Sequence, residues 1–160
     1  EKKGCYTPTF EEVRSMAWQC IAEGATGLVF YSWFDVKRNP DVTFDRQWDG
    51  LKRLAAEIDR MAPILLSTET VPDVAVRYGE SAADEATWLR HLVRRAGGKL
   101  YVFAVNDGDG AGRVDFTLPQ AAKAVRVLTE DRSIELHGSS FYDQFDRLDV
   151  RVYEIEVSDR

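Results

Sequence analysis

Residues Gly27 to Asp35, with the sequence GLVFYSWFD, combine aromatic side chains with a carboxylate in one short run. The run has no polar residue before Ser32, and Trp33 and Asp35 bring an aromatic plane and an anion to its end. An unbroken apolar run of this length predicts a strand, Gly27 to Trp33, buried on both faces as in a parallel sheet. Such a strand needs neighbours on both sides.

Other groups of chemically active residue types do not form recognisable sites. Residues 106–110 (NDGDG) cluster oxygen ligands as a calcium loop does. However, position 117, where an EF-hand requires Glu, is Thr, and the segment joins predicted strands instead of helices. We interpret it as a polar hairpin loop. His91 and His137 lie far apart without ligand spacing, so we predict no metal and no cofactor.

Charge and composition restrict the partners. The 160 residues include 27 acidic and 21 basic side chains, giving a net charge of -6. Binding to nucleic acid needs clustered positive charge, so we predict no nucleic-acid partner. No run reaches the roughly 18 apolar residues that span a bilayer, so we predict no membrane partner. Cys5 and Cys20 are too few for a disulfide scaffold, and Cys20 is predicted to lie on the apolar face of a helix.

Two helices flank the apolar run. Thr9 and Glu12 have capping-box spacing, and apolar residues then recur at helical spacing until Gly24, which predicts a helix over 9–23. After a charged loop over 35–46, a second apolar stripe predicts a helix over 47–62 that Pro63 closes. Helix, buried strand, loop and helix form the rhythm of an α/β unit.

From about residue 67 the helical period gives way to short alternating segments separated by turn residues. A hairpin turn is predicted at 95–98. The segments predict an antiparallel β-sandwich, with a domain boundary between residues 66 and 67. The predicted strands are 74–78, 87–94, 99–106, 113–118, 124–129, 133–137, 140–145 and 150–157.

The first part of the chain resembles a known family. The string YTPTFEEVRSMAWQCIAEGATGLVFYSWFD, followed by WDGLKRLAAEIDRMAPIL, is similar to the last helix-strand-helix portion of a (β/α)8-barrel (TIM-barrel) glycoside hydrolase of the β-galactosidase-like retaining clan. FYDQF at 141–145 and VRVY at 150–153 are similar to the closing strands of the β-sandwich that often follows such barrels. The resemblance implies a fragment: residues 1–66 the C-terminal end of the barrel, residues 67–160 an all-β antiparallel accessory sandwich.

The resemblance also implies a division of roles. Retaining hydrolysis needs two carboxyl groups about 5 Å apart, and no residue of this chain matches the motif of either one. The chain therefore contributes a wall of the site for a carbohydrate substrate, at the carboxyl end of the strand. Trp33 is expected to stack on a sugar ring and Asp35 to hydrogen-bond a sugar hydroxyl, while a plug and a loop cap are their structural alternatives. Tyr31 and Phe34 are expected to be packing residues.

Two other hypotheses stay open. The chain as a free-standing carbohydrate-binding or protein-interaction module would have no use for a doubly buried strand. A self-associating domain would instead pair this orphan strand with a second copy. In the glycoside hydrolase hypothesis the partners of the strand are the missing N-terminal barrel strands.

Overall fold

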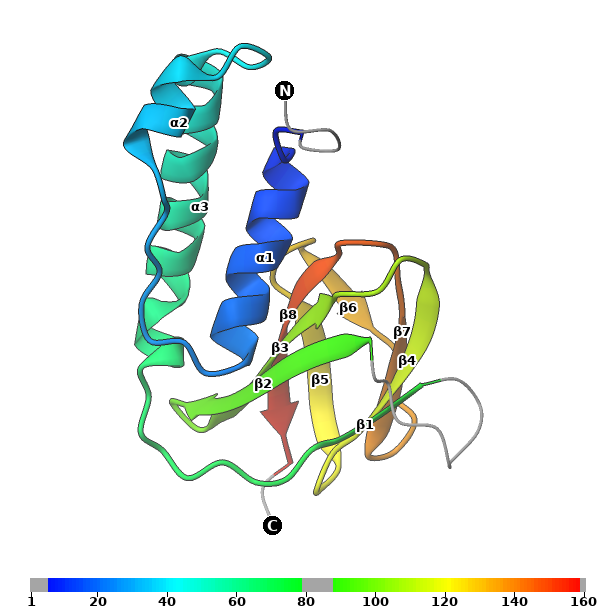
Figure 1. Cartoon of the computed structure of the whole chain (residues 1–160). Coiled ribbons are helices and arrows are strands. Elements are labelled where there is room, and N and C mark those ends of the chain that lie inside the picture. Colours follow the sequence, from blue (N-terminus) through cyan, green and yellow to red (C-terminus); the bar gives the residue numbers. More distant parts are fainter. Residues whose placement is uncertain (1–5, 79–87, 159–160) are drawn as a thin grey trace.

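The computed structural model describes residues 6–78 and 88–158, in which three helices precede two antiparallel sheets (Figure 1). The helices are α1 (Phe10–Ala22), α2 (Trp33–Arg38) and α3 (Phe44–Leu65). The strands are β1 (Ala75–Tyr78), β2 (Leu89–Ala96), β3 (Lys99–Asn106), β4 (Gly112–Thr117), β5 (Ala122–Val127), β6 (Arg132–Ile134), β7 (Ser140–Phe145) and β8 (Val150–Val157).

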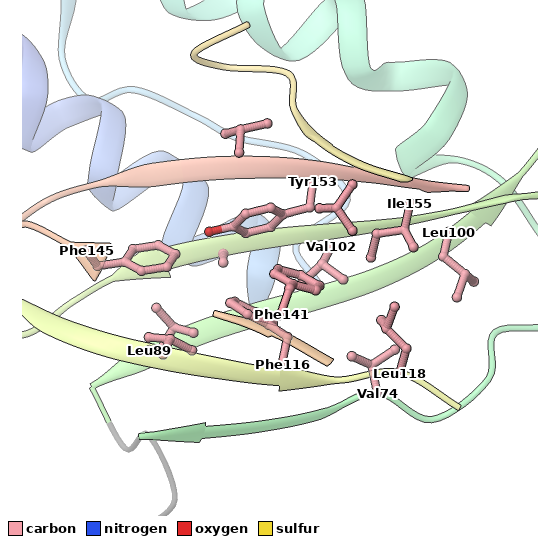
Figure 2. Packing of buried hydrophobic residues seen from close by; sticks show 14 residues of the cluster. Val74, Leu89, Leu100, Val102, Phe116, Leu118, Phe141, Phe145, Tyr153 and Ile155 are labelled. Carbon is pink, nitrogen blue, oxygen red and sulfur yellow. The ribbon is translucent and has the colours of Figure 1, made fainter. Parts of the chain in front are cut away.

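The strands form a sandwich, as the alternating sequence pattern predicts. One sheet has the order β1-β4-β7 and the other the order β2-β3-β8-β5-β6, and every pair is antiparallel. Apolar side chains from both sheets fill the space between them (Figure 2). Phe116 and Phe141 stack there, with ring centroids 4.7 Å apart, and Tyr153 packs against both rings. The antiparallel sandwich is therefore confirmed.

The strand predictions hold closely, because each strand has its own alternation and turn signals. Three strands match to the residue, 99–106, 140–145 and 150–157, and the others lie within three residues wherever their ends are described. Residue 87, predicted to begin the second strand, lies outside the described residues. The predicted hairpin pairs Ala96 with Lys99, and Gly97 and Gly98 take the positive φ angles, 58° and 79°, of a tight two-residue turn.

The second predicted hairpin, at 106–110, is wrong. β3 pairs with β2 and β8, whereas β4 pairs with β1 and β7, so the loop crosses from one sheet to the other. The buried side chain of Asn106 holds this crossing: its Nδ2 donates to the carbonyl oxygens of Gly110 and Asp146, both at 2.8 Å, and its Oδ1 accepts from the Gly108 amide. The polar loop residues therefore serve a connection between the sheets.

The first helix begins where the sequence predicts. Thr9 Oγ1 accepts from the Glu12 amide and Glu12 accepts from the Thr9 amide, which completes the capping box. The helix packs on the outer face of the five-stranded sheet, where Trp18 stacks on Phe103 with centroids 5.7 Å apart. A second apolar cluster thus joins α1 and α3 to β3 and β8.

Two details of the helices differ from the prediction. The second helix starts at Phe44 and runs past Pro63 to Leu65, because a proline in the last turn removes only one helical hydrogen bond. Cys20 is exposed, so it is not a small core residue, while Cys5 lies outside the described residues. None of the helices in the described ranges has the length and apolar character needed to cross a bilayer.

The predicted strand at 27–33 is not formed. Residues 27–32 have no regular structure, and Trp33 already belongs to α2. In Figure 1 this segment leads from the end of α1 to α2 and stands apart from both sheets. The physical reason is that a strand requires a neighbouring backbone, and within the described residues neither sheet extends to this segment. The sandwich is confirmed, whereas the barrel end remains a prediction.

Candidate functional site

The apolar segment 27–31 is largely exposed. Leu28 is half-buried against the cluster under the helices, but the exposed fractions of Val29 and Tyr31 reach 96% and 95%. Phe30 is 50% exposed. Burying such side chains is favourable by about 1.5–3 kcal/mol each, so this segment is the most uneconomical surface that the described residues present. It is an apolar surface without a cover.

At the end of this segment, Ser32 starts the short helix α2. Its Oγ accepts from the Asp35 amide at 3.4 Å and donates to Asp35 Oδ2 at 2.6 Å. The carboxylate lies in the first helical turn, where the helix dipole favours a negative charge. Asp35 therefore has the capping role expected as its structural alternative, and the structure leaves its role toward a ligand untested.

The loop between α2 and α3 is organised by two amide side chains. Asn39 Oδ1 accepts from the backbone amides of Asp41 and Val42, at 2.8 and 3.1 Å, which forms a local turn. Gln47 Nε2 donates to the carbonyl oxygens of Val36 and Val42, at 3.3 and 3.0 Å. Gln47 thus bonds the end of α2 and the loop to the first turn of α3. These contacts set how α2 lies on α3.

Three aromatic rings meet where α2 lies on α3. Trp33 makes edge-to-face contacts with Phe44, at 4.9 Å between centroids, and with Trp48, at 5.6 Å. Phe44 and Trp48 lie one helical turn apart and stack with centroids 5.9 Å apart and planes 14° apart. The indoles stay accessible, because Trp33 is 49% and Trp48 40% exposed. We call Trp33, Phe44 and Trp48 the aromatic cluster.

The structure separates the two predicted site residues by changing the backbone between them. In a strand Trp33 and Asp35 would share one face, but in a helix residues two apart do not face each other. Trp33 keeps a half-exposed aromatic plane, and Asp35 points to another side of α2. The prediction that Tyr31 and Phe34 are packing residues is wrong, since both are exposed, and Phe34 instead lies under the Arg38 guanidinium.

Sequence reasoning missed Phe44 and Trp48 as neighbours of Trp33. It placed Trp48 on the buried stripe of the second helix and assigned residue 44 to the loop. The available signal was the aromatic pair at i and i+4, which places both rings on one side of a helix. Among the described residues, no group of three or more His, Cys, Asp or Glu side chains is arranged to hold a metal ion.

Comparison with known proteins gives a fold but no family. No family model matches the sequence, and no curated protein matches it. The structure is similar to that of an α-amylase from Geobacillus thermoleovorans, solved in complex with acarbose, with a TM-score of 0.62 and 16% identity. The match covers 94% of this chain and 34% of that one. An Anoxybacillus α-amylase matches with a TM-score of 0.48 and 14% identity, over 76% of this chain and 25% of that one.

The first match defines a glycoside hydrolase-related fold. At 16% identity it carries no further than the fold. The chain spans about a third of the length of that α-amylase, and the aligned part includes helical segments as well as the sandwich, because it covers nearly the whole chain. The second match is too weak to add to this conclusion.

Proposed function

We propose that this chain is the C-terminal part of a glycoside hydrolase. In this proposal residues 1–66 complete the catalytic barrel, of the β-galactosidase-like retaining clan, and residues 67–160 form a sandwich that stabilises it. The observation that supports it is the exposed apolar segment 27–31, in a chain whose fold covers a third of an α-amylase. Barrel strands outside this chain would cover the segment and convert it into a strand.

The catalytic carboxyl pair then belongs to the part of the enzyme that this chain does not contain. Trp33, following directly on the proposed strand, lies where the active site of such a barrel is built. Its half-exposed indole suits the apolar C–H face of a sugar ring. Asp35 would accept a hydrogen bond from a hydroxyl on another part of the substrate, because it points to another side of α2.

The test is the activity of a longer protein that carries the residues upstream of Glu1. We expect it to hydrolyse one member of a panel of α-glucans and chromogenic β-galactosides, and Trp33→Ala to lower kcat/KM at least about tenfold, or about 1.4 kcal/mol. Tyr142→Ala is the matched control, because Tyr142 on β7 is 47% exposed, close to Trp33 at 49%. Equal kinetics of the two variants would remove Trp33 from the site.

One observation favours the alternative of a free-standing binding or interaction module. The helices and the five-stranded sheet share an apolar cluster, so the chain has the packing of a self-sufficient unit. A module would bind sugar or protein without any upstream segment and would show no hydrolysis in the longer protein. Size-exclusion chromatography of the 160-residue chain would reveal the third alternative, self-association through segment 27–31, as a dimer.

A further inference from the structure

We infer that Trp48, supported by Phe44, is a positioning residue that fixes the ring plane of Trp33. This inference rests on the proposed function, because it concerns how the proposed sugar-stacking surface is held. Sequence, comparisons and resemblance assign no role of this kind to either residue. It follows from the contacts between α2 and α3.

The short helix α2 has no buried residue of its own. A helix of six residues is too short to be stable alone, so its orientation depends on what it touches. α3 provides the contact surface, through the Gln47 side chain and through the rings of Phe44 and Trp48. The orientation of Trp33 is therefore set from α3.

α3 is a firm base for this purpose. It has 22 residues, its Leu54 is buried, and Glu57 is bonded to Arg14 and Trp18 of α1. Phe44 and Trp48, one turn apart, form a nearly parallel pair on its first turns. Both make edge-to-face contacts with Trp33, at 76° and 90°. Two such contacts from one rigid helix restrict the rotation of the Trp33 ring.

Stacking on a sugar requires an aromatic plane that already has the right orientation. Removing Trp48 would leave Trp33 in the chain but free to turn. The loss would therefore be transmitted through Trp33, and a residue that acts through another has no effect once that other residue is gone. This distinguishes positioning from a direct contact between Trp48 and the sugar.

The first experiment uses the 160-residue chain and needs no sugar. The chain has four tryptophans, whose indole N–H resonances are assigned by single Trp→Phe substitutions. In Trp48→Ala we expect the Trp33 resonance to shift and broaden, and in Trp48→Phe to stay near its original position. The Trp18 resonance, from an indole bonded to Glu57 at 3.0 Å, should stay unchanged and reports that the fold is intact. An unmoved Trp33 resonance in Trp48→Ala overturns the inference.

The second experiment is a double-mutant cycle in the longer protein, with soluble starch and a nitrophenyl β-galactoside as probes. We expect Trp48→Ala to lower kcat/KM about tenfold, Trp48→Phe to recover most of that loss, and the Trp33→Ala/Trp48→Ala double variant to equal Trp33→Ala. Additive losses would mean that Trp48 touches the sugar itself, and they overturn the inference. If neither probe is hydrolysed, the proposed function fails and the sugar role of Trp48 with it, while the resonance of Trp33 separately decides whether Trp48 holds the ring.

Discussion

Arg14 on α1 and Glu57 on α3 form a two-pronged ion pair, with Nη2 2.7 Å from Oε1 and Nε 2.9 Å from Oε2. Their side chains are only 20% and 13% exposed. Trp18 Nε1 donates to the same carboxylate at 3.0 Å, and Arg14 also reaches the Val150 carbonyl oxygen of β8 at 3.5 Å. One carboxylate thus connects both long helices where they meet the sheet.

We therefore expect Glu57→Gln to lower the free energy of unfolding by about 2 kcal/mol, because it leaves the Arg14 charge half-buried without its partner. Urea unfolding of the 160-residue chain measures this change. Asp49→Asn, on the same helix, removes an exposed pair with Lys52 and should cost less than about 0.5 kcal/mol. Equal effects of the two substitutions would show that the Arg14–Glu57 pair adds nothing to the helix contact.

The exposed segment 27–31 makes the same substitution behave differently in two contexts. In the 160-residue chain Tyr31→Ser should change stability by less than about 0.5 kcal/mol, because Tyr31 is 95% exposed. In a longer protein whose upstream residues cover the segment, the same change should cost about 2 kcal/mol. Thermal unfolding of both proteins gives the comparison. A similar small change in both would argue that nothing covers the segment.

The shared cluster under the helices predicts one cooperative unfolding transition for the chain. Trp18 on α1 and Phe103 on β3 are fully buried against each other, so the helices and the sandwich lose their packing together. Phe103→Ala should cost about 3–5 kcal/mol and lower the helical signal and the Trp88 fluorescence transition in parallel. Two separate transitions would instead support independent units on either side of residues 66 and 67.

The strands could be predicted from the sequence because their signals are local. In β3 the side chains alternate between the sandwich interior, as for Val102, and the cluster under the helices, as for Phe103. Since both faces are apolar, β3 reads as a continuous hydrophobic run, and the hairpin glycines give its register.

Segment 27–33 shows where this reasoning stops. An apolar run predicts that it will be covered, but not whether the covering strands lie in the same chain. Without them, the run stays irregular and Trp33 joins a helix capped by Ser32. The aromatic cluster could not be predicted for the same reason, because the contacts of Trp33 with Phe44 and Trp48 depend on α2 being a helix that packs on α3.

A carboxylate at the edge of the sandwich predicts a dependence of stability on acid. Burial alone would raise the pKa of Glu130, but hydrogen bonds from Arg132 and Arg151, together with their charges, outweigh it and hold that pKa below its ordinary value of 4.5. Arg151 is itself buried and also pairs with Asp143, at 3.1 Å. The ionised form of Glu130 is therefore favoured by folding.

Because the folded pKa is the lower one, Glu130 contributes its full stabilisation above pH 4.5 and loses it as the pH falls through the lowered value. We expect Glu130→Gln to lower the free energy of unfolding at pH 7 and to flatten its decline on acidification, measured by urea unfolding at successive pH values. Glu135→Gln, at an exposed position beyond β6, is the control and should keep the wild-type slope. Parallel pH profiles for wild type and Glu130→Gln would show that the arginine contacts do not favour the ionised carboxylate.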